Sequence, residues 1–164
     1  MKSILTAIIV LFFSTGFLFS QSKSESNSTE VKIAKFDPSR DAAKDIKDAI
    51  KEATKTHKRI ILDVGGEWCI WCHRLDTLFI RNPSLFNYMN KHFVYVKVNY
   101  GPKNKNEKVL ANYPPIPGYP HWFVLDTDGK LLKSESSGEF EEGKGHSPKK
   151  VMAFLKEWVP QNKK

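Results

Sequence analysis

The chain of 164 residues has the length of a single domain, and 40% of its residues are hydrophobic, 12% aromatic and 27% charged. This composition excludes a disordered, collagen-like or coiled-coil protein. The 26 lysines and arginines exceed the 18 aspartates and glutamates, but they are spread along the chain, so nucleic acid is not an expected partner. With two cysteines, a scaffold of several disulfides is also excluded.

Residues 1–20 are predicted to be a secretory signal peptide. Lys2 precedes an apolar run from Ile4 to Phe19. The run is shorter than the roughly 20 apolar residues of a membrane-spanning helix, so a signal is favoured over a retained anchor. We therefore expect an exported protein, periplasmic or secreted.

Two polar segments flank the expected domain. Residues 21–35 begin with a serine-rich stretch and predict a flexible leader, and residues 161–164 form a short basic tail. The domain itself is placed at residues 36–160.

The first half of this domain alternates between helix and strand. Apolar residues recur at helical spacing between residues 42 and 53, which predicts a helix. The segment 59–64 (RIILDV) is short and apolar on both faces, as in a central strand of a parallel sheet. Gly65-Gly66 then turns the chain toward both cysteines, after which a helix continues to Phe79.

The second half repeats this alternation. Further helical turns are predicted at 85–89, a strand at 93–99, a short helix at 105–113, a hairpin from 122–126 and 130–133, and a terminal helix that begins at Ser147-Pro148. The order of elements predicts an α/β fold with a central mixed β-sheet flanked by helices.

The two cysteines, three positions apart at the start of a predicted helix, carry the chemistry. A helix N-terminus lowers the pKa of a thiol, so Cys69 is expected to be the attacking thiolate. Cys72 lies about one helical turn further on and can attack a mixed disulfide at Cys69 to release the product. An inert structural disulfide is the alternative, but so short a loop stabilises a fold little.

The same residues also fit two cofactor sites. Cys69 to His73 match the C-x-x-C-H haem-attachment pattern, with His73 as axial ligand, and these residues could supply three zinc ligands. The preceding apolar strand disfavours a small helical haem protein, and no second cysteine pair supplies a fourth zinc ligand. We therefore expect no metal and no cofactor beyond a redox-active Cys69–Cys72 disulfide, with His73 either tuning the thiols or exposed.

Two segments resemble thioredoxin-family proteins. Residues 61–72 (ILDVGGEWCIWC) resemble the active-site strand and turn of that family, and residues 118–132 (GYPHWFVLDTDGKLL) resemble its proline loop and following hairpin. The resemblance extends over about 37–159 and is strongest to exported members similar to the soluble domain of disulfide-interchange proteins. It implies a thioredoxin-like fold and a thiol–disulfide oxidoreductase.

The resemblance also implies roles for Asp63 and Pro120. An acid within an apolar strand is costly to bury, and in the family an acid at this position relays the proton of the second cysteine. A solvated or simply hydrogen-bonded Asp63 is the alternative. Pro120 matches the family's cis proline opposite the cysteines, where the backbone of Tyr119 would pair with an extended substrate.

Three aromatic or imidazole side chains near the motifs are further candidates. Trp68 and Trp71 flank the cysteines and are expected to offer apolar contacts to a substrate protein. His121 follows the proline and is expected to tune the disulfide, with ordinary loop packing as the alternative.

These features predict an exported, monomeric thiol–disulfide oxidoreductase that reduces or interchanges disulfides in extracytoplasmic proteins. Its expected partners are protein thiols and disulfides and a membrane or soluble electron donor. The alternative is a noncatalytic binding module that uses its tryptophan-rich face to hold a partner.

Overall fold

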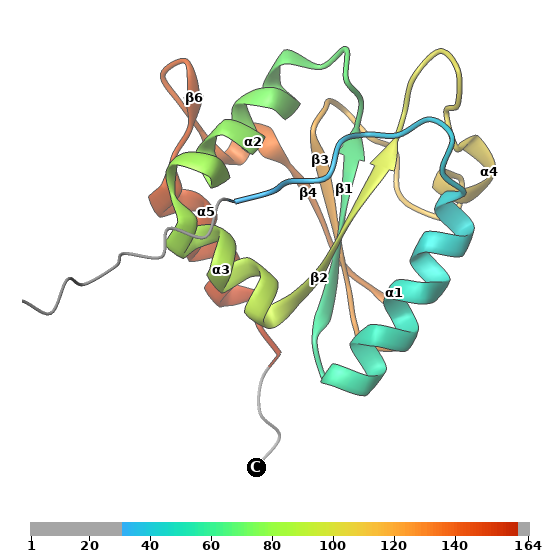
Figure 1. Ribbon diagram of the computed structural model, residues 1–164. Helices are drawn as coiled ribbons and strands as arrows, with labels where there is room; N and C mark the ends of the chain where they lie inside the picture. The colour runs from blue at the N-terminus through green and yellow to red at the C-terminus, as the bar shows by residue number, and fades with distance from the viewer. Residues whose placement is uncertain (1–30, 161–164) are drawn as a thin grey trace, which may run out of the picture.

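The computed structural model describes residues 31–160, which form a four-stranded mixed sheet in the order β2-β1-β3-β4 (Figure 1). The strands are β1 (Arg59–Gly65), β2 (Phe93–Asn99), β3 (His121–Leu125) and β4 (Leu131–Ser136). The central strand β1 runs parallel to β2 and antiparallel to β3, and β3 and β4 form the predicted hairpin. The predicted mixed sheet is confirmed.

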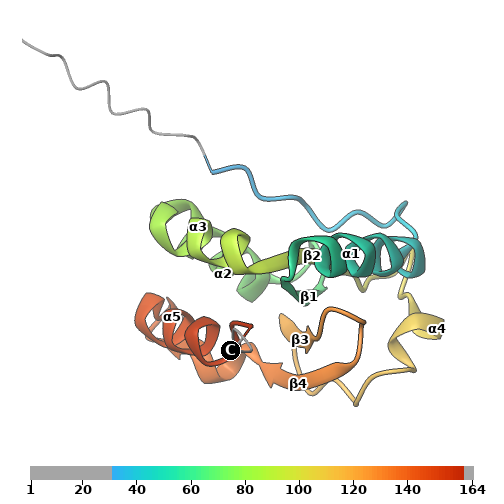
Figure 2. The same cartoon turned by 90° about the horizontal axis from the view of Figure 1, so that it is seen from below.

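Helices cover both faces of this sheet. Figure 2, which looks along the strands, shows α1 (Ala42–Thr56) and α4 (Glu107–Leu110) on one side. The other side carries α2 (Ile70–Arg81), α3 (Pro83–His92) and α5 (Pro148–Glu157). A small two-stranded sheet, β5 (Glu141–Glu142) and β6 (Gly145–His146), packs against α2 through β6. The fold is therefore the predicted helix–sheet–helix sandwich.

The sequence of β1 is apolar because helices cover both faces of the sheet. Ile60, Leu62 and Val64 belong to the core on the α1 side, whereas Ile61 belongs to the core against α2, α3 and α5. Side chains alternate along a strand, so a central strand covered on both faces needs apolar residues at successive positions. Asp63 is the one acid in this strand, and it lies on the side of Ile61.

Local signals account for the helix boundaries. Asp41 caps α1, because its carboxylate accepts hydrogen bonds from the backbone N–H groups of Ala43 and Lys44. The break between α2 and α3 falls at Asn82, directly before Pro83. Proline has no N–H to continue a helix but fits its first position, so it ends one helix and begins the next.

The structure differs from the expectations in a few places. The helix expected at 105–113 is only four residues long, and β5, β6 and the 3₁₀ helix η1 (Ser137–Phe140) have no counterpart among the predicted elements. Elements of two to four residues are too short to show a periodic pattern. Ile33 packs against the core, so the packed chain begins upstream of the predicted boundary at residue 36.

The predicted signal peptide at 1–20, most of the predicted leader and the predicted tail at 161–164 lie outside the described residues. Within residues 31–160, no helix combines the length and apolar character needed to cross a membrane.

Candidate active site

Cys69 and Cys72 form a disulfide at the N-terminus of α2. Cys69 is the residue that caps the helix, and its Sγ accepts a hydrogen bond from the backbone N–H of Cys72 at 3.1 Å. This position exposes Cys69 Sγ to the unpaired N–H groups of the first turn, which favour an anion. Once the bond is reduced, the helix can therefore stabilise a thiolate at Cys69.

Glycine at position 65 allows Cys72 to approach the sheet. A Cβ added to Gly65 would lie 2.5 Å from Cys72 Sγ and 2.9 Å from the ring of Phe36, closer than packed atoms can come. Phe36 packs against both cysteines, and its backbone N–H donates to Glu67 Oε1 at 2.9 Å. Both cysteines are consequently buried, with 4% and 1% of their surface exposed.

Asp63 lies two residues before Gly65 on the same face of β1, and is therefore on the side of the sheet that carries Cys72. Only 1% of its surface is exposed. The Tyr95 hydroxyl donates to Asp63 Oδ2 at 2.5 Å, and the Trp122 indole N–H donates to Oδ1 at 3.2 Å. The predicted acid is thus buried and held by neighbours on both adjacent strands.

Burial and the charge of Lys97 shift the pKa of the Asp63 carboxyl in opposite directions. Loss of hydration raises the pKa of Asp63 to about 6, although the Lys97 ammonium at 3.8 Å and the two hydrogen bonds oppose the rise. A carboxyl with this pKa can take up or release a proton near neutral pH.

Lys97 and Asp76 were not predicted from the sequence and join α2 to the sheet. Lys97 Nζ lies 2.6 and 2.7 Å from the two carboxylate oxygens of Asp76, and 4.1 Å from the centre of the Phe36 ring. Burial is the main cause of the raised pKa of Asp76, and Lys97 opposes it. The buried site therefore contains two carboxyl groups and one ammonium.

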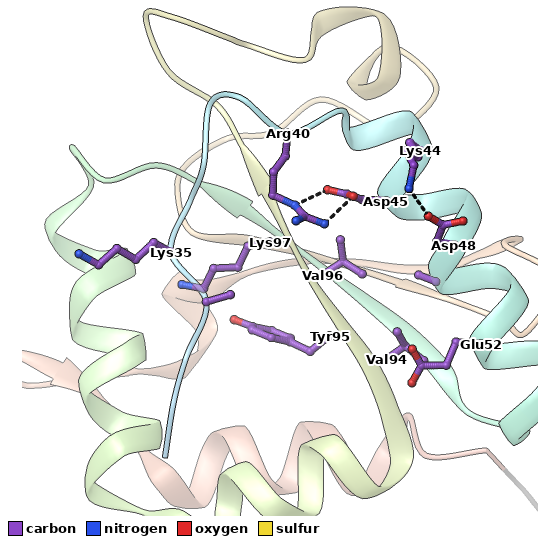
Figure 3. Close-up of a pocket in the computed structure, with 12 residues that line it drawn as sticks. Lys35, Arg40, Lys44, Asp45, Asp48, Glu52, Val94, Tyr95, Val96 and Lys97 are labelled. Atoms are coloured by element: carbon purple, nitrogen blue, oxygen red, sulfur yellow. Dashed lines mark hydrogen bonds and ion pairs between the residues drawn. The ribbon is translucent and has the colours of Figure 1, made fainter. Parts of the chain in front are cut away.

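A sequence signal for Lys97 does exist. In strand 93–99, alternation places Lys97 on the same face as Phe93 and Tyr95, where a lysine needs a partner. Figure 3 shows Tyr95 and Lys97 projecting to one side of β2, whereas Val94 and Val96 project toward α1.

Three of the predicted substrate-binding residues lie close together. Trp68 is 56% exposed, donates its indole N–H to the Tyr100 carbonyl at 2.6 Å and meets the Tyr119 ring edge-on at 5.5 Å. Tyr119 also packs against the cysteines, and the Tyr119–Pro120 peptide bond is cis, as expected. An exposed indole therefore lies beside the proline loop.

Trp71 points to the opposite flank of the disulfide. Its ring packs against the cysteines, carries the Arg74 guanidinium 4.3 Å above its centre and meets the His146 ring edge-on at 5.5 Å. The structure therefore separates the two predicted tryptophans: Trp68 contacts the proline loop, and Trp71 contacts β6.

The two predicted tuning histidines are both held by hydrogen bonds. His73 Nε2 lies 2.8 Å from the Glu67 carbonyl oxygen. His121 Nε2 lies 2.8 Å from Ser134 Oγ, and its ring contacts Phe123 on the face of β3 that is directed toward α1, opposite Asp63. These contacts agree with ordinary packing, the alternative considered for His121. Its influence on the disulfide stays a prediction.

Metal-ligating residues do not gather elsewhere in the described chain. Among residues 31–160, no group of three or more histidine, cysteine, aspartate or glutamate side chains is arranged to hold a metal ion.

Several solved structures are similar to this chain over most of its length. A disulphide isomerase from Xylella fastidiosa Temecula1 is 29% identical, with a TM-score of 0.67 over 77% of this chain and 98% of that chain. DsbH oxidoreductase is 25% identical, with a TM-score of 0.53, and the match covers 81% of this chain and 95% of the DsbH chain. The C-terminal domain of Neisseria meningitidis DsbD shares the fold. It is 18% identical, with a TM-score of 0.54, and the match covers 76% of this chain and 98% of that domain.

Curated relatives match over a shorter stretch. Spermatogenesis-associated protein 20 from Rattus norvegicus and from Homo sapiens is 30% identical over 66 residues, which is 40% of this chain but 8% of theirs. The match thus spans a small part of those proteins. The thioredoxin-like family model matches residues 41–127, more than half of the chain, and includes β1, both cysteines and β3. The chain therefore belongs to the thioredoxin-like family.

Proposed function

We propose that this protein is an exported thiol–disulfide oxidoreductase that reduces or interchanges disulfides in extracytoplasmic proteins. The observation that carries the proposal is the Cys69–Cys72 disulfide at the N-terminus of α2, with the buried carboxyl of Asp63 on the same side of the sheet. Similarity to a disulphide isomerase and to DsbH supports this chemistry. The apolar run in residues 4–19 supports export.

The reaction begins with the reduced dithiol. The Cys69 thiolate attacks one sulfur of a substrate disulfide, forms a mixed disulfide and releases the other substrate sulfur as a thiolate. The N–H groups at the start of α2 favour the anionic form of Cys69. An adjacent indole, Trp68, and the backbone at Tyr119 and Pro120 hold the substrate segment beside Cys69.

The second step resolves the mixed disulfide. Cys72 gives up its proton, with the Asp63 carboxylate as acceptor, and attacks Cys69 Sγ. The new Cys69–Cys72 bond forms as the bond between Cys69 and the substrate sulfur breaks, and the substrate leaves as a thiolate that then takes up a proton. Over both steps, two electrons pass from the protein to the substrate. A donor dithiol in the membrane or in solution must then reduce the protein for another cycle. We favour this reducing or interchanging direction because the Ile-Trp pair between the cysteines lacks the proline of thioredoxin proper.

A trapping experiment tests the proposal. Cys72→Ser should accumulate mixed disulfides through Cys69 with extracytoplasmic proteins, whereas the matched variant Cys69→Ser should not. The wild type, supplied with dithiothreitol, should also accelerate insulin reduction. If neither variant traps a protein and the wild type does not accelerate insulin reduction, the noncatalytic binding module replaces this proposal.

Export has a separate test. The full chain should be recovered outside the cytoplasm, with its N-terminus at Gln21 after cleavage behind Ser20. Recovery of the intact N-terminus in the cytoplasm would contradict export without affecting the proposed chemistry.

A further inference from the structure

A basic pocket lies between α2 and β6, next to Trp71. It has a volume of about 240 Å³, and its lining includes Arg74, Thr77, Arg81, Asn82, Lys144 and His146. Arg74 and Arg81 are seven residues apart, so they lie two turns apart on one side of the helix. Lys144 and His146 come from the β5–β6 hairpin, which lies beside α2 in Figure 1.

The positive charges of this pocket have no carboxylate partner in the described residues. Within residues 31–160, neither Arg74, Arg81 nor Lys144 forms an ion pair with a carboxylate, and the pocket lining contains no acidic residue. The pocket in Figure 3 differs, because its lining also contains acidic residues, and two of its cations form the pairs Arg40–Asp45 and Lys44–Asp48. The pocket beside Trp71 therefore carries an excess of positive charge that no ion pair within residues 31–160 balances.

His146 supplies a second, independent observation. Its side chain is buried, with 7% of the residue exposed, and neither ring nitrogen has a hydrogen-bond partner in the described part of the chain. A neutral imidazole always carries one N–H donor, and buried donors are nearly always paired. Burial, aided by the charge of Arg74, lowers the pKa of His146 to about 4, so near pH 7 the ring is such a neutral donor.

These observations describe a site for a carboxylate. Guanidinium groups bind carboxylates in a bidentate manner, and a volume of about 240 Å³ suits a side chain rather than a large ligand. Arg74, which lines the pocket, lies over Trp71, the residue next to Cys72, so the pocket begins near the disulfide and extends away from it along α2. An occupant would therefore belong to the molecule whose sulfur reacts with Cys69.

We propose that this pocket binds an acidic side chain of the substrate protein, close in sequence to the substrate's reactive cysteine. The pocket centres on Thr77, about 12 Å along the α2 axis from Cys69. An extended peptide covers this distance in about four residues. This inference rests on the proposed function and names the substrate class as proteins with Asp or Glu about four positions from a disulfide-bonded cysteine.

The test compares two peptides that differ only in the charge at two positions. Each is a decapeptide whose single cysteine is a mixed disulfide with 2-mercaptoethanol, and glutamate or glutamine occupies the positions four residues before and after that cysteine. Reduced wild-type protein should react with the glutamate peptide about three to ten times faster at low salt. The ratio should fall toward one in Arg81→Gln/Lys144→Gln.

A matched control separates the pocket from overall charge. Lys47→Gln/Lys55→Gln removes two exposed charges from α1, on the other face of the sheet, and should leave the ratio unchanged. An equal fall in this control, or a ratio of one in the wild type, overturns the inference. If the wild type reduces neither peptide nor insulin, the proposed function fails, and the binding measurement that follows decides the inference alone.

Binding can be measured without redox chemistry. Peptides with serine in place of cysteine are titrated into the oxidised protein, and backbone amide NMR shifts are recorded. The glutamate peptide should shift signals of residues 74–82 and 143–146, and the glutamine peptide should not. In a second titration, inorganic sulfate is added at constant ionic strength, alone and in competition with the glutamate peptide. Competition by sulfate supports the site, whereas shifts with sulfate and none with the glutamate peptide show a free-anion site and overturn the proposal.

Discussion

Asp63, the proposed proton acceptor, illustrates how burial of one carboxyl carries a cost in stability. Its pKa is raised to about 6, chiefly by burial, so folding favours the protonated form. Between its ordinary pKa of 3.8 and about pH 6, the folded state therefore loses stability as the pH rises, and the full loss persists above pH 6. The same shift gives the carboxyl a pKa suited to proton transfer near neutral pH.

Asp63→Asn is accordingly expected to stabilise the folded protein at neutral pH. The gain should reach at most about 3 kcal/mol at pH 7.5 and should nearly vanish near pH 3, where Asp63 is largely protonated in both states. Urea unfolding at both pH values measures the gain in the free energy of unfolding. Glu139→Gln, a substitution at an exposed carboxylate, is the control. A gain of equal size at both pH values would contradict the ionisation argument. Activity should fall in the same variant, because Cys72 loses its proton acceptor.

The two cysteines should differ in reactivity once reduced. Cys69 caps α2 and should be alkylated rapidly near neutral pH, whereas Cys72, further inside the helix and against Gly65, should be protected. Mass mapping after brief iodoacetamide treatment checks this expectation, and the urea-unfolded protein, with both thiols labelled alike, is the control. Preferential labelling of Cys72 would reverse the assigned roles.

The junction of β1 and α2 depends on the absence of one side chain. Gly65→Ala would place a Cβ 2.5 Å from Cys72 Sγ and 2.9 Å from Phe36, so strand and helix would have to separate. Overpacking of this kind typically costs about 1–3 kcal/mol. We expect a lower midpoint of urea unfolding and slower disulfide exchange. Gly118→Ala is the control, because nothing lies within 4 Å of its added Cβ; an equal loss in both variants would refute the packing argument.

Elements with a long periodic pattern were predictable, and short ones were not. The strands at 59–64 and 93–99 were predicted within one residue, because apolar alternation and turn residues mark them locally. The β5–β6 hairpin has two residues in each strand and no periodicity, so the sequence carried no signal for it. That hairpin nevertheless supplies three of the eight residues that line the basic pocket.

At the scale of the whole molecule, buried histidines should make the fold sensitive to acid. Burial is the main cause that lowers the pKa values of His121 and His146 to about 4. A base with a depressed pKa favours folding only while neutral, so stability is lost as the pH falls from about 6.5 to 4. Each histidine contributes up to about 3 kcal/mol to this loss, against opposing gains from Asp63 and Asp76, whose pKa values are raised by burial.

The free energy of unfolding should therefore decrease between pH 7 and pH 4. The double variant His121→Gln/His146→Gln should flatten this decrease, whatever its absolute stability, because glutamine does not titrate. Urea unfolding at pH 7, 5.5 and 4 gives the slope. An unchanged slope in the double variant would assign the acid sensitivity to other groups.

The sequence by itself determined the order of the main helices and strands and the position of the C-x-x-C pair at a helix start. Both follow from patterns within a few residues, such as apolar spacing, glycine turns and prolines at helix starts. It also identified Asp63 as an acid in an apolar strand, since burial without a partner would be costly.

Only the tertiary structure decided which side chains surround that acid and which charges remain unpaired. Tyr95, Lys97 and Trp122 reach Asp63 from two other strands, and Asp76 reaches Lys97 from α2. The basic pocket likewise joins α2 to a hairpin more than 60 residues away. Such contacts depend on strand register and helix packing, which local sequence patterns do not specify.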